Sequence, residues 1–564
     1  MKNMKMNDLQ SISKTKYESW LFNFWEDIDI KNELLSIQNN EIEIYDRFCR
    51  DIECGTAGFR AIMGLGTSRI NIYTISKVTY ALGEVLKEKF LNPIVVIAYD
   101  TRKNSSIYAE MAAGVLASQN VSSYIFKHIQ PTPLLSFAIR RMNCSAGIMI
   151  TASHNSSEYN GFKVYGSDGS QMDDTSDIEK KIKNADIFYY KNILSFDEYL
   201  KSGLISYVPE NIEDDYLNFI LGLSSKKGLD INLSYSPLNG CSNKIVCKIF
   251  KEIRLNKFSI VDKQQFPDEN FTTCPLPNPE ESSSFELVLN LAKKNNSDLA
   301  ILNDPDGDRV GVAVLHNNKY KILDGNSIAA VIFYYLLLIN KNKNRKVLIK
   351  SIVSGGVIED LANEYRVEII ETFTGFKHIG KEILNLEKKN RLGEFFFAYE
   401  ESNGYLFDTN VRDKDGIASS LILCNAADYF KRQNMTLVDV LNKLSRKYGF
   451  HLNKKIDFTS RGNIPKNFMK DFKSKFMSKF KNVTGYYDYK NLVYFDGKKI
   501  KEINSKFKYD VLVFHLAENQ KVIVRPSGTE PKIKFYVLTK SKNYVEAQKK
   551  CKKITDFIED FSVF

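Results

Sequence analysis

Two short apolar runs in this 564-residue chain end abruptly in polar loops, and this pattern limits the folds open to it. Ala146–Ile150 is followed at once by Thr151–Asn155 (TASHN), and Leu299–Asn303 by Asp304–Arg309 (DPDGDR). A continuous apolar run of roughly 4–8 residues is typical of a strand that is buried on both faces. In open α/β sheets, the loops beyond the strand ends carry the chemistry. The sequence therefore predicts α/β layers with both polar loops at strand ends.

Other apolar runs alternate with helical patterns along most of the chain. Strand-like runs occur at 94–100, 346–350 and 394–399, and helical patterns at 107–118, 329–339 and 357–364. This alternation predicts α/β layers with largely buried sheets. The last part differs, because strand-like runs at 511–516, 521–525 and 533–538 follow one another before a helical pattern over 544–561. That order predicts an α+β domain.

The length of the chain exceeds what one hydrophobic core supports, so three or four domains are expected. We place the boundaries near residues 210, 325 and 450. The predicted domains are an α/β domain with the serine loop (1–210), an α/β domain with the aspartate loop (211–325), an α/β domain with the loop Glu400–Gly404 (326–450) and an α+β domain with the loop Arg525–Pro531 (451–564).

Composition and charge exclude several classes of protein. The hydrophobic fraction of 43% and the charged fraction of 26% are those of a globular chain. The net charge of +11 comes from lysines spread along the whole sequence, so we expect no nucleic-acid partner. The apolar run 329–339 is too short to span a bilayer, and Met1–Ser11 lacks the apolar core of a signal peptide. Eight scattered cysteines without a CxxC pair indicate reduced thiols. We expect a cytoplasmic protein that does not bind membranes.

Ser153 is a candidate nucleophile. A serine hydroxyl reacts readily only when a base, a metal or a phosphate changes its chemistry. The Gly-x-Ser-x-Gly elbow of hydrolases is absent. The nearby Asn160–Lys163 (NGFK) adds a turn and a lysine. From these residues alone, an ordinary turn capped by Ser or Asn remains the alternative.

The aspartate loop is a stronger signal. Asp304, Asp306 and Asp308 alternate on one tight loop, so their carboxylates can converge on a divalent cation. An EF-hand is excluded, because its sixth position would be Arg309 instead of Gly and its twelfth Leu315 instead of Glu. A haloacid-dehalogenase-type phosphatase is a closer rival, but it has Thr or Val where Asp308 stands. A solvated acidic turn would leave the preceding apolar strand unexplained.

Two further loops carry polar groups suited to a phosphorylated sugar. Glu400–Gly404 (EESNG) supplies carboxylates and a hydroxyl that can pair with sugar hydroxyls, although a polar turn closed by Asn-Gly is the alternative. Arg525–Pro531 (RPSGTEP) supplies a guanidinium, two hydroxyls and a glycine, a combination that suits a phosphate. It lacks the ending of a Walker loop, and a proline-rich hairpin turn is its alternative.

These four motifs, in this order, resemble the α-D-phosphohexomutase superfamily, the phosphoglucomutases and phosphomannomutases. The likeness extends from about Glu53 to Leu538. Cys54–Arg60 (CGTAGFR) and Glu400–Tyr405 look most like the phosphoglucomutase-2/phosphopentomutase branch. The resemblance implies three related α/β domains with mixed sheets around a central cleft, and an α+β C-terminal domain that closes over the substrate.

The resemblance also implies a role for each motif residue. Ser153 would be phosphorylated in the active enzyme, and one phosphoserine oxygen would join Asp304, Asp306 and Asp308 in holding Mg²⁺. Lys377, in Thr374–His378 (TGFKH), would be the general base, with His154 as its rival. The remaining site residues would be Arg60, Lys163 and Arg309 lining the cleft, Glu400 and Ser402 reading the sugar hydroxyls, and Arg525, Ser527, Gly528 and Thr529 holding the phosphate that does not react. Phe59 and Gly307 depart from the residues usual in the family, and neither touches the chemistry.

The implied activity is that of an isomerase of carbohydrate metabolism, an intramolecular phosphotransferase. It would interconvert glucose 1-phosphate and glucose 6-phosphate through a phosphoserine and a 1,6-bisphosphate intermediate, with glucose 1,6-bisphosphate also serving as activator. A phosphomannomutase or a phosphopentomutase with the same mechanism stays open. A non-catalytic sugar-phosphate sensor or a bisphosphate synthase is less favoured, because Ser153 and all three aspartates are intact.

Overall fold

The structure is a computed structural model that describes residues 6–55, 58–189, 193–224, 228–255, 257–340, 342, 344–459, 464–465, 467–504, 508–526 and 532–562. The chain divides into two compact units. The first comprises Met1–Leu323, Gly375–Ala398 and Ser402–Asp428, and the second Asp324–Thr374, Tyr399–Glu401 and Tyr429–Phe564.

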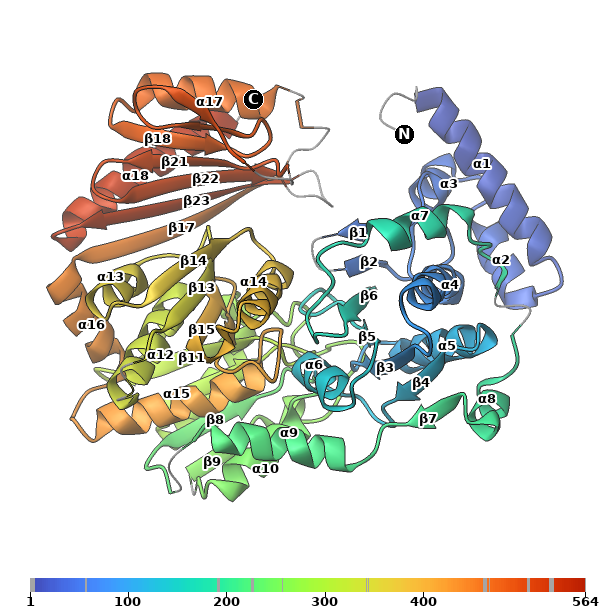
Figure 1. The fold of residues 1–564 in the computed structure, drawn as a ribbon, viewed down its shortest axis with the longest axis horizontal. Coiled ribbons are helices and arrows are strands. Elements are labelled where there is room, and N and C mark those ends of the chain that lie inside the picture. Colours follow the sequence, from blue (N-terminus) through green and yellow to red (C-terminus); the bar gives the residue numbers. More distant parts are fainter. Residues whose placement is uncertain are drawn as a thin grey trace. The chain divides into compact units, whose positions relative to one another are not determined.

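The serine loop belongs to a seven-stranded mixed sheet in the first unit (Figure 1). β3, β4, β5 and β7 pair in parallel, whereas β1, β2 and β6 pair antiparallel. Because side chains alternate between the faces of a strand, Val95 and Ile97 join the core with α4 and α5, and Val96 is buried on the other face. The sheet order is β1 (Cys54–Gly55), β2 (Gly58–Ile62), β6 (Tyr159–Gly166), β5 (Ala146–Ile150), β3 (Ile94–Tyr99), β4 (Ser122–Ile125) and β7 (Ile205–Tyr207).

Helices pack on both faces of this sheet. α6 contacts β3 and β5, while α4 and α5 share the core on the opposite face (Figure 1). Ahead of the sheet, α1, α2 and α3 form an aromatic cluster around Trp20, whose ring lies 5.1 Å from that of Tyr73. The helices are α1 (Met6–Asn23), α2 (Ile28–Ser36), α3 (Glu41–Phe48), α4 (Ile72–Lys89), α5 (Ser105–Ser118), α6 (Thr132–Arg141), α7 (Ser176–Asn184) and α8 (Phe196–Ser202).

The aspartate loop belongs to a five-stranded mixed sheet, also in the first unit. β8, β9 and β10 are parallel, and β10, β11 and β12 form an antiparallel meander. The sheet order is β12 (Lys319–Ile322), β11 (Val310–His316), β10 (Leu299–Asn303), β8 (Asn232–Ser236) and β9 (Lys257–Ile260), accompanied by α9 (Asn211–Gly222), α10 (Asn243–Glu252) and α11 (Glu286–Asn295).

A four-stranded sheet follows, in which β13 and β14 run parallel. Its order is β14 (Glu368–Thr372), β13 (Val347–Ser351), β15 (Phe395–Glu400) and β16 (Gly404–Leu406). The helices of this part of the chain are α12 (Gly325–Ile339), α13 (Val357–Glu364), α14 (Phe376–Lys388), α15 (Gly416–Lys431) and α16 (Leu437–Tyr448).

The last sheet lies in the second unit and is antiparallel throughout its described pairings. One face packs against α17 (Phe468–Lys479) and α18 (Tyr544–Ser562) through a cluster that includes Phe472, Phe514 and Phe535. The sheet order is β17 (Phe450–Thr459), β23 (Lys532–Ser541), β22 (Gln520–Pro526), β21 (Leu512–Leu516), β18 (Val483–Asp488), β19 (Val493–Phe495) and β20 (Ile500–Glu502).

The predicted fold class is confirmed: three α/β parts with mixed sheets precede a C-terminal part built on an antiparallel sheet. The strand predictions at 94–100, 146–150 and 299–303 correspond to β3, β5 and β10. No helix among the described residues has both the length and the apolar character needed to cross a membrane. All eight cysteines are free thiols, and burial raises the pKa of Cys144 to about 11.

Candidate active site

The serine loop follows β5 and holds Ser153 in an unusual backbone conformation. Ser153 has a φ of 54°, in the left-handed region, which costs a residue with a side chain about 1–2 kcal/mol. Its Oγ donates to Asp304 Oδ2 at 3.2 Å and lies 3.1 Å from His154 Nδ1. The side chain is nearly inaccessible, at 2% exposure. The conformation therefore directs the hydroxyl at the aspartate loop.

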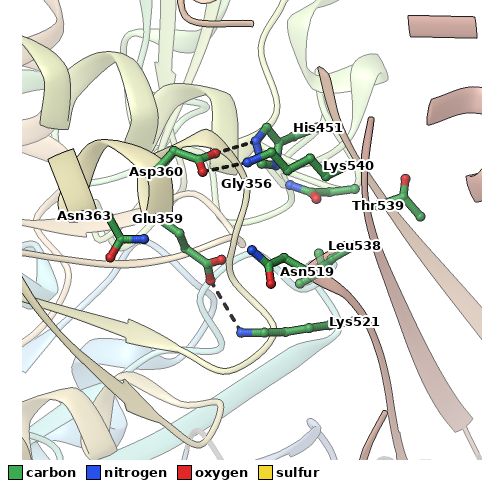
Figure 2. A pocket seen from close by; sticks show the side chains of 11 residues that line it. Gly356, Glu359, Asp360, Asn363, His451, Asn519, Lys521, Leu538, Thr539 and Lys540 are labelled. Carbon is green, nitrogen blue, oxygen red and sulfur yellow. Dashed lines mark hydrogen bonds and ion pairs between the residues drawn. The ribbon is translucent and has the colours of Figure 1, made fainter. Parts of the chain in front are cut away.

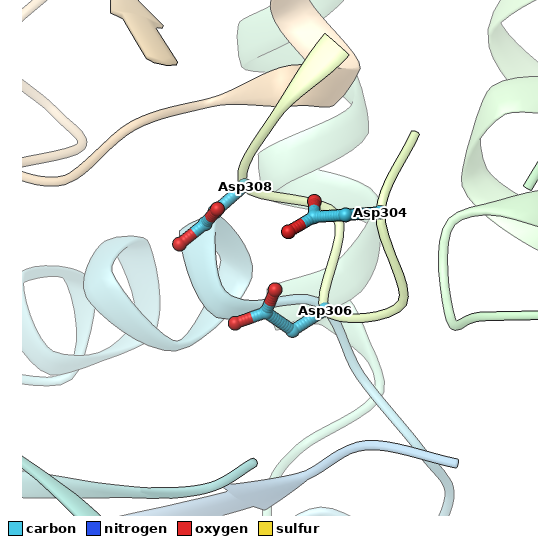
Figure 3. Close-up of side chains that lie close together, drawn as sticks. All are labelled: Asp304, Asp306 and Asp308. Atoms are coloured by element: carbon cyan, nitrogen blue, oxygen red, sulfur yellow. The ribbon is translucent and has the colours of Figure 1, made fainter. Parts of the chain in front are cut away.

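The aspartate loop joins β10 to β11, and its three carboxylates turn toward a common space (Figure 3). Asp304, Asp306 and Asp308 are buried, and one oxygen from each lies within 4.8 Å of the others. Gly307 favours the tight turn, because its φ of 69° is strained for a residue with a side chain and a Cβ there would lie 2.5 Å from Ser242 Oγ, which would have to shift. The predicted convergence of the three carboxylates is confirmed.

One oxygen of each carboxylate is anchored by the protein. Such anchoring contacts fix the orientation of metal ligands. The contacts are Arg309 N–H to Asp304 Oδ1 at 2.9 Å, Lys163 Nζ and Thr132 Oγ1 to Asp306 Oδ2 at 2.8 and 2.9 Å, and Lys414 Nζ to Asp308 Oδ2 at 3.1 Å.

The remaining oxygens fit a cation. Asp306 Oδ1 and Asp308 Oδ1 are buried and accept no hydrogen bond, while Asp304 Oδ2 faces Ser153 Oγ. The nearest described cation to Asp308 Oδ1 is Arg309 Nε, at 3.8 Å. A buried carboxylate oxygen without a hydrogen bond is costly, and a metal cation would satisfy both atoms at once. The donor set consists of oxygens only, as hard divalent cations prefer. These residues therefore fit a divalent metal ion.

The charges of the three carboxyl groups also favour a bound cation. Burial, and then the negative charges of Asp306 and Asp308, raise the pKa of Asp304 well above its usual range. Burial also disfavours the charged form of Asp306, but the charge and hydrogen bond of Lys163, together with hydrogen bonds to Asp304 and Thr132, lower the pKa of that carboxyl. Three ionised carboxylates at this distance repel one another, and a bound cation removes that penalty.

Positive charge surrounds the serine loop. Burial first, and then the cations Arg309, Arg60, Arg102 and Lys163, lower the pKa of His154 well below its usual value. Burial and the charge of Arg102 lower the pKa of the Arg60 guanidinium to about 10. Arg60 Nη1 also donates to Asn155 Oδ1 at 2.7 Å, which places it at the loop. Such a concentration of cations suits an anionic ligand such as a phosphate.

His154 should therefore stay neutral in the metal-free, unphosphorylated protein. Nearby cations and burial both disfavour the imidazolium, so protonation is displaced to more acidic pH. We expect the His154 ring resonances to show no titration step near the ordinary pKa of about 6.5. NMR of the six histidines, with His154→Asn to assign the signal, measures this. A step near the ordinary value that disappears in His154→Asn would contradict the electrostatic description.

Lys377 lies at the start of α14, in the first unit. Its Nζ donates to the backbone oxygen of Asp173 at 3.4 Å. The Asp173 carboxylate in turn contacts His378 Nδ1 at 2.8 Å and Lys381 Nζ at 2.6 Å. Among the described contacts, Lys377 does not touch Ser153. Its role as general base stays a prediction.

The other two motifs are described in different parts of the structure. Glu400 ends β15 in the second unit and is buried, whereas Ser402 belongs to the first unit and is half-buried. Glu401 Oε2 accepts hydrogen bonds from Ser351 and Ser354 at 3.1 and 2.9 Å. Arg525 lies near the end of β22 and is half-buried, and Ser527, Gly528 and Thr529 lie outside the described residues. The roles of these residues stay predictions.

Several residues at the triad carry no signal in the sequence. Lys414 contacts Asp308 and is held by Asp413 Oδ1 at 3.0 Å, while Tyr165 Oη donates to Asp413 Oδ2 at 2.8 Å. Thr132, at the start of α6, contacts Asp306. These partners are far apart in sequence, so no local pattern marks them.

A second polar pocket, of about 50 Å³, lies within the second unit (Figure 2). Its charged groups already pair across it: Asp360 contacts His451 Nε2 at 2.8 Å and Lys540 Nζ at 2.7 Å, and Glu359 contacts Lys521 Nζ at 3.6 Å. These ion pairs connect α13 to β17, β22 and β23. With the cations neutralised in this way, the pocket fits a structural junction better than an anion site.

Comparison with known proteins gives concordant matches along the chain. Profiles of the phosphoglucomutase/phosphomannomutase family match residues 51–187 (α/β/α domain I), 214–317 (domain II), 324–448 (domain III) and 490–550 (C-terminal domain). A phosphoglucomutase from Staphylococcus aureus is 34% identical over 533 residues, covering 91% of this chain and 94% of that protein.

Solved structures share the fold. Parafusin (pp63), a phosphoglucomutase from Paramecium in its open form, has a TM-score of 0.66 at 18% identity, covering 91% of this chain and 95% of that one. The N-acetylphosphoglucosamine mutase of Aspergillus fumigatus, in complex with GlcNAc-6P and magnesium, has a TM-score of 0.50 at 13% identity, covering 91% and 96%.

Proposed function

This chain belongs to the phosphoglucomutase/phosphomannomutase family, and we propose that within it the protein is a phosphoglucomutase, interconverting glucose 1-phosphate and glucose 6-phosphate. Members of the family are intramolecular phosphotransferases. The observation that carries the proposal is the contact of Ser153 Oγ with Asp304 Oδ2 at 3.2 Å, inside a buried acidic triad and among cationic side chains. The Staphylococcus aureus relative supports glucose as the sugar.

In the proposed reaction, Ser153 carries a phosphoryl group and passes it to a free hydroxyl of the sugar phosphate. The bond between Ser153 Oγ and phosphorus breaks as the bond to the sugar oxygen forms; a base takes the hydroxyl proton, and Ser153 Oγ takes up a proton as it leaves. The resulting glucose 1,6-bisphosphate reorients. In the second transfer Ser153 Oγ loses its proton and bonds to the other phosphorus, while the bond from that phosphorus to the sugar oxygen breaks and the sugar oxygen leaves protonated. The same bisphosphate is the activator, because it phosphorylates a resting Ser153.

Asp304, Asp306 and Asp308, with one phosphoserine oxygen, would hold Mg²⁺. An all-oxygen donor set with two unsatisfied buried oxygens suits this ion, and the Aspergillus fumigatus mutase was solved with magnesium. When bound, it supplies neutralisation of the charge on the transferred group. Arg60, Lys163 and Arg309 add positive charge around the same group.

The base that takes the hydroxyl proton is proposed to be Lys377, with His154 as competitor. The neutral His154 imidazole, 3.1 Å from Ser153 Oγ, has a nitrogen able to accept a proton.

We also propose that Glu400 and Ser402 read the sugar hydroxyls and that Arg525, Ser527, Gly528 and Thr529 hold the unreactive phosphate. The proposed domains end near residues 210, 325 and 450, and the protein is proposed to be cytoplasmic.

A coupled assay tests the proposal. Glucose, mannose and ribose 1-phosphates are offered in parallel, each with Mg²⁺ and a trace of the matching bisphosphate. We expect the highest kcat/KM with glucose 1-phosphate. A preference for mannose or ribose 1-phosphate would instead assign a phosphomannomutase or a phosphopentomutase, the latter in agreement with the branch that Cys54–Arg60 resembles. No turnover with any of the three sugar phosphates, with Ser153 phosphorylated, would overturn the proposal in favour of a sensor.

A further inference from the structure

The carbonyl groups of the serine loop converge on one buried arginine, Arg102. Its Nη2 donates to the backbone oxygens of Ser153 at 2.6 Å and Asn155 at 2.5 Å. Its Nη1 donates to those of Ser156 at 2.7 Å and Tyr159 at 3.0 Å. The side chain is fully buried. A guanidinium presents several donors in a rigid plane, so these four bonds hold the loop in one shape.

The nitrogen side of Ser153 is held from the same place. Its backbone N–H donates to Thr151 Oγ1 at 2.8 Å, and the Thr151 hydroxyl donates to Asp100 Oδ2 at 2.6 Å. Asp100 is also the ion partner of Arg102, whose Nε lies 3.3 Å from Asp100 Oδ2. The backbone groups on both sides of the Ser153 side chain are therefore hydrogen-bonded, directly or through Thr151, to one buried ion pair, Asp100 and Arg102, at the end of β3.

We propose, on the basis of the mutase function above, that Asp100, Thr151 and Arg102 form a positioning brace that holds Ser153 in its left-handed conformation and so sets the direction of its Oγ. The described hydrogen bonds of these three residues to the serine loop go to its backbone and not to Ser153 Oγ. A serine with a φ of 54° pays a conformational cost, and the loop would relax without bonds that compensate it. Relaxation would move Oγ away from Asp304 Oδ2, the atom it now faces at 3.2 Å.

The partners of Arg102 explain why a brace of this kind suits a mutase. Ser153 alternates between a neutral hydroxyl and a phosphate of charge about −2 during each turnover. The described contacts of the Arg102 guanidinium are to backbone carbonyls, Asp100 and the ring of Phe271, none of which changes charge in that cycle. A cation that bound the Ser153 side chain itself would shift its position each time that side chain gained or lost the phosphate charge. The brace therefore keeps one loop geometry through both phosphoryl transfers.

Thr151→Val tests the brace with the smallest change of shape. It removes the hydroxyl that links Ser153 N–H to Asp100 and keeps the volume of the side chain. A misplacement of the nucleophile by about 1 Å costs on the order of 10²-fold, so we expect kcat to fall by that factor. KM should stay within about twofold, because the residues that bind the substrate are unchanged. Thr151→Ser should restore most of kcat, since it restores the hydroxyl.

Thr79→Val is the matched control. Thr79 is buried in α4, and its hydroxyl donates to the Ile75 carbonyl at 2.7 Å, so Thr79→Val removes a buried threonine hydroxyl far from the serine loop. Thr151→Val removes two hydrogen bonds, one of them to a carboxylate, and should therefore lower the thermal midpoint further. With activity measured well below both midpoints, a purely structural role predicts small losses of kcat in both valine variants, and that outcome would overturn the brace. The expected result is a loss of kcat only in Thr151→Val.

A direct readout separates this proposal from the mutase function on which it rests. Intact-mass spectrometry follows the single-turnover phosphorylation of Ser153 by glucose 1,6-bisphosphate in wild type, Thr151→Val and Thr79→Val. We expect slow phosphorylation in Thr151→Val alone. If the wild type itself takes up no phosphate and shows no turnover, the mutase function fails. If all three take up phosphate at one rate, the mutase function stands and the brace fails.

Discussion

Replacing Ser153 by alanine should lower turnover by more than about 10⁴-fold while the protein stays folded, because loss of a covalent nucleophile removes the only route through a phosphoenzyme. The side chain is buried and small, and alanine keeps its Cβ, so little packing is lost. The left-handed backbone is strained for alanine as it is for serine, and Arg102 continues to hold the loop carbonyls. The measurement is the coupled assay, with intact-mass spectrometry for the phosphate on the protein.

Ser167→Ala is the control for this experiment. Ser167 is exposed in the turn that follows β6. β6 belongs to the same sheet as β5, the strand that leads into the serine loop. Wild type and Ser167→Ala should each gain the mass of one phosphoryl group from glucose 1,6-bisphosphate, and Ser153→Ala should gain none. Retained activity in Ser153→Ala, or a phosphate that persists on it, would show that another residue carries the group.

The strands that lead into the serine and aspartate loops could be predicted because their signal is local. β5 and β10 are each buried along their whole length; β5 is apolar or small throughout, and β10 is apolar up to its last residue, the buried Asn303. The same signal follows β3, where Asp100, Thr101 and Arg102 succeed an apolar strand. No role is predicted for that third polar loop from the sequence, although its pattern matches the other two.

Other parts of the site depend on tertiary contacts that no local pattern records. Lys414 and Asp308 meet at 3.1 Å although 106 residues separate them, as do Thr132 and Asp306 across 174 positions. The charged run that contains Lys414 is indistinguishable from a solvated surface segment in sequence. The packing of helices α1–α3 also depends on tertiary contacts, because their buried aromatic and aliphatic side chains form one cluster with Tyr73 on α4.

Within the loop Glu400–Gly404, two residues make described contacts that anchor the loop. The Glu401 carboxylate accepts hydrogen bonds from the hydroxyls of Ser351 and Ser354, so it makes contacts within the second unit. Asn403 ties the end of the motif to Val310, the first residue of β11, through its Nδ2 and its backbone oxygen. These anchors restrict the loop around Glu400 and Ser402, whose role in reading the sugar stays a prediction.

Replacing Asp304 by asparagine should separate stability from activity. The raised pKa of Asp304 means that its folded state disfavours the ionised form, so this carboxylate destabilises the metal-free protein as pH rises from the unfolded-state pKa toward neutrality. Asparagine removes that charge and retains an oxygen for the Arg309 N–H. We expect a metal-free thermal midpoint at neutral pH equal to or above that of wild type, and turnover lower by about 10³-fold because the metal is held poorly.

Addition of Mg²⁺ then distinguishes the two proteins. A ligand at 100 times its Kd stabilises the folded state by about 2.7 kcal/mol, so the thermal midpoint of wild type should rise with Mg²⁺. Asp304→Asn should show little rise at the same concentration. Asp214→Asn, which removes the same charge from an exposed position on α9, should respond as wild type does. An equal response of Asp304→Asn and wild type would place the metal elsewhere, and the unsatisfied oxygens of Asp306 and Asp308 would then need another partner.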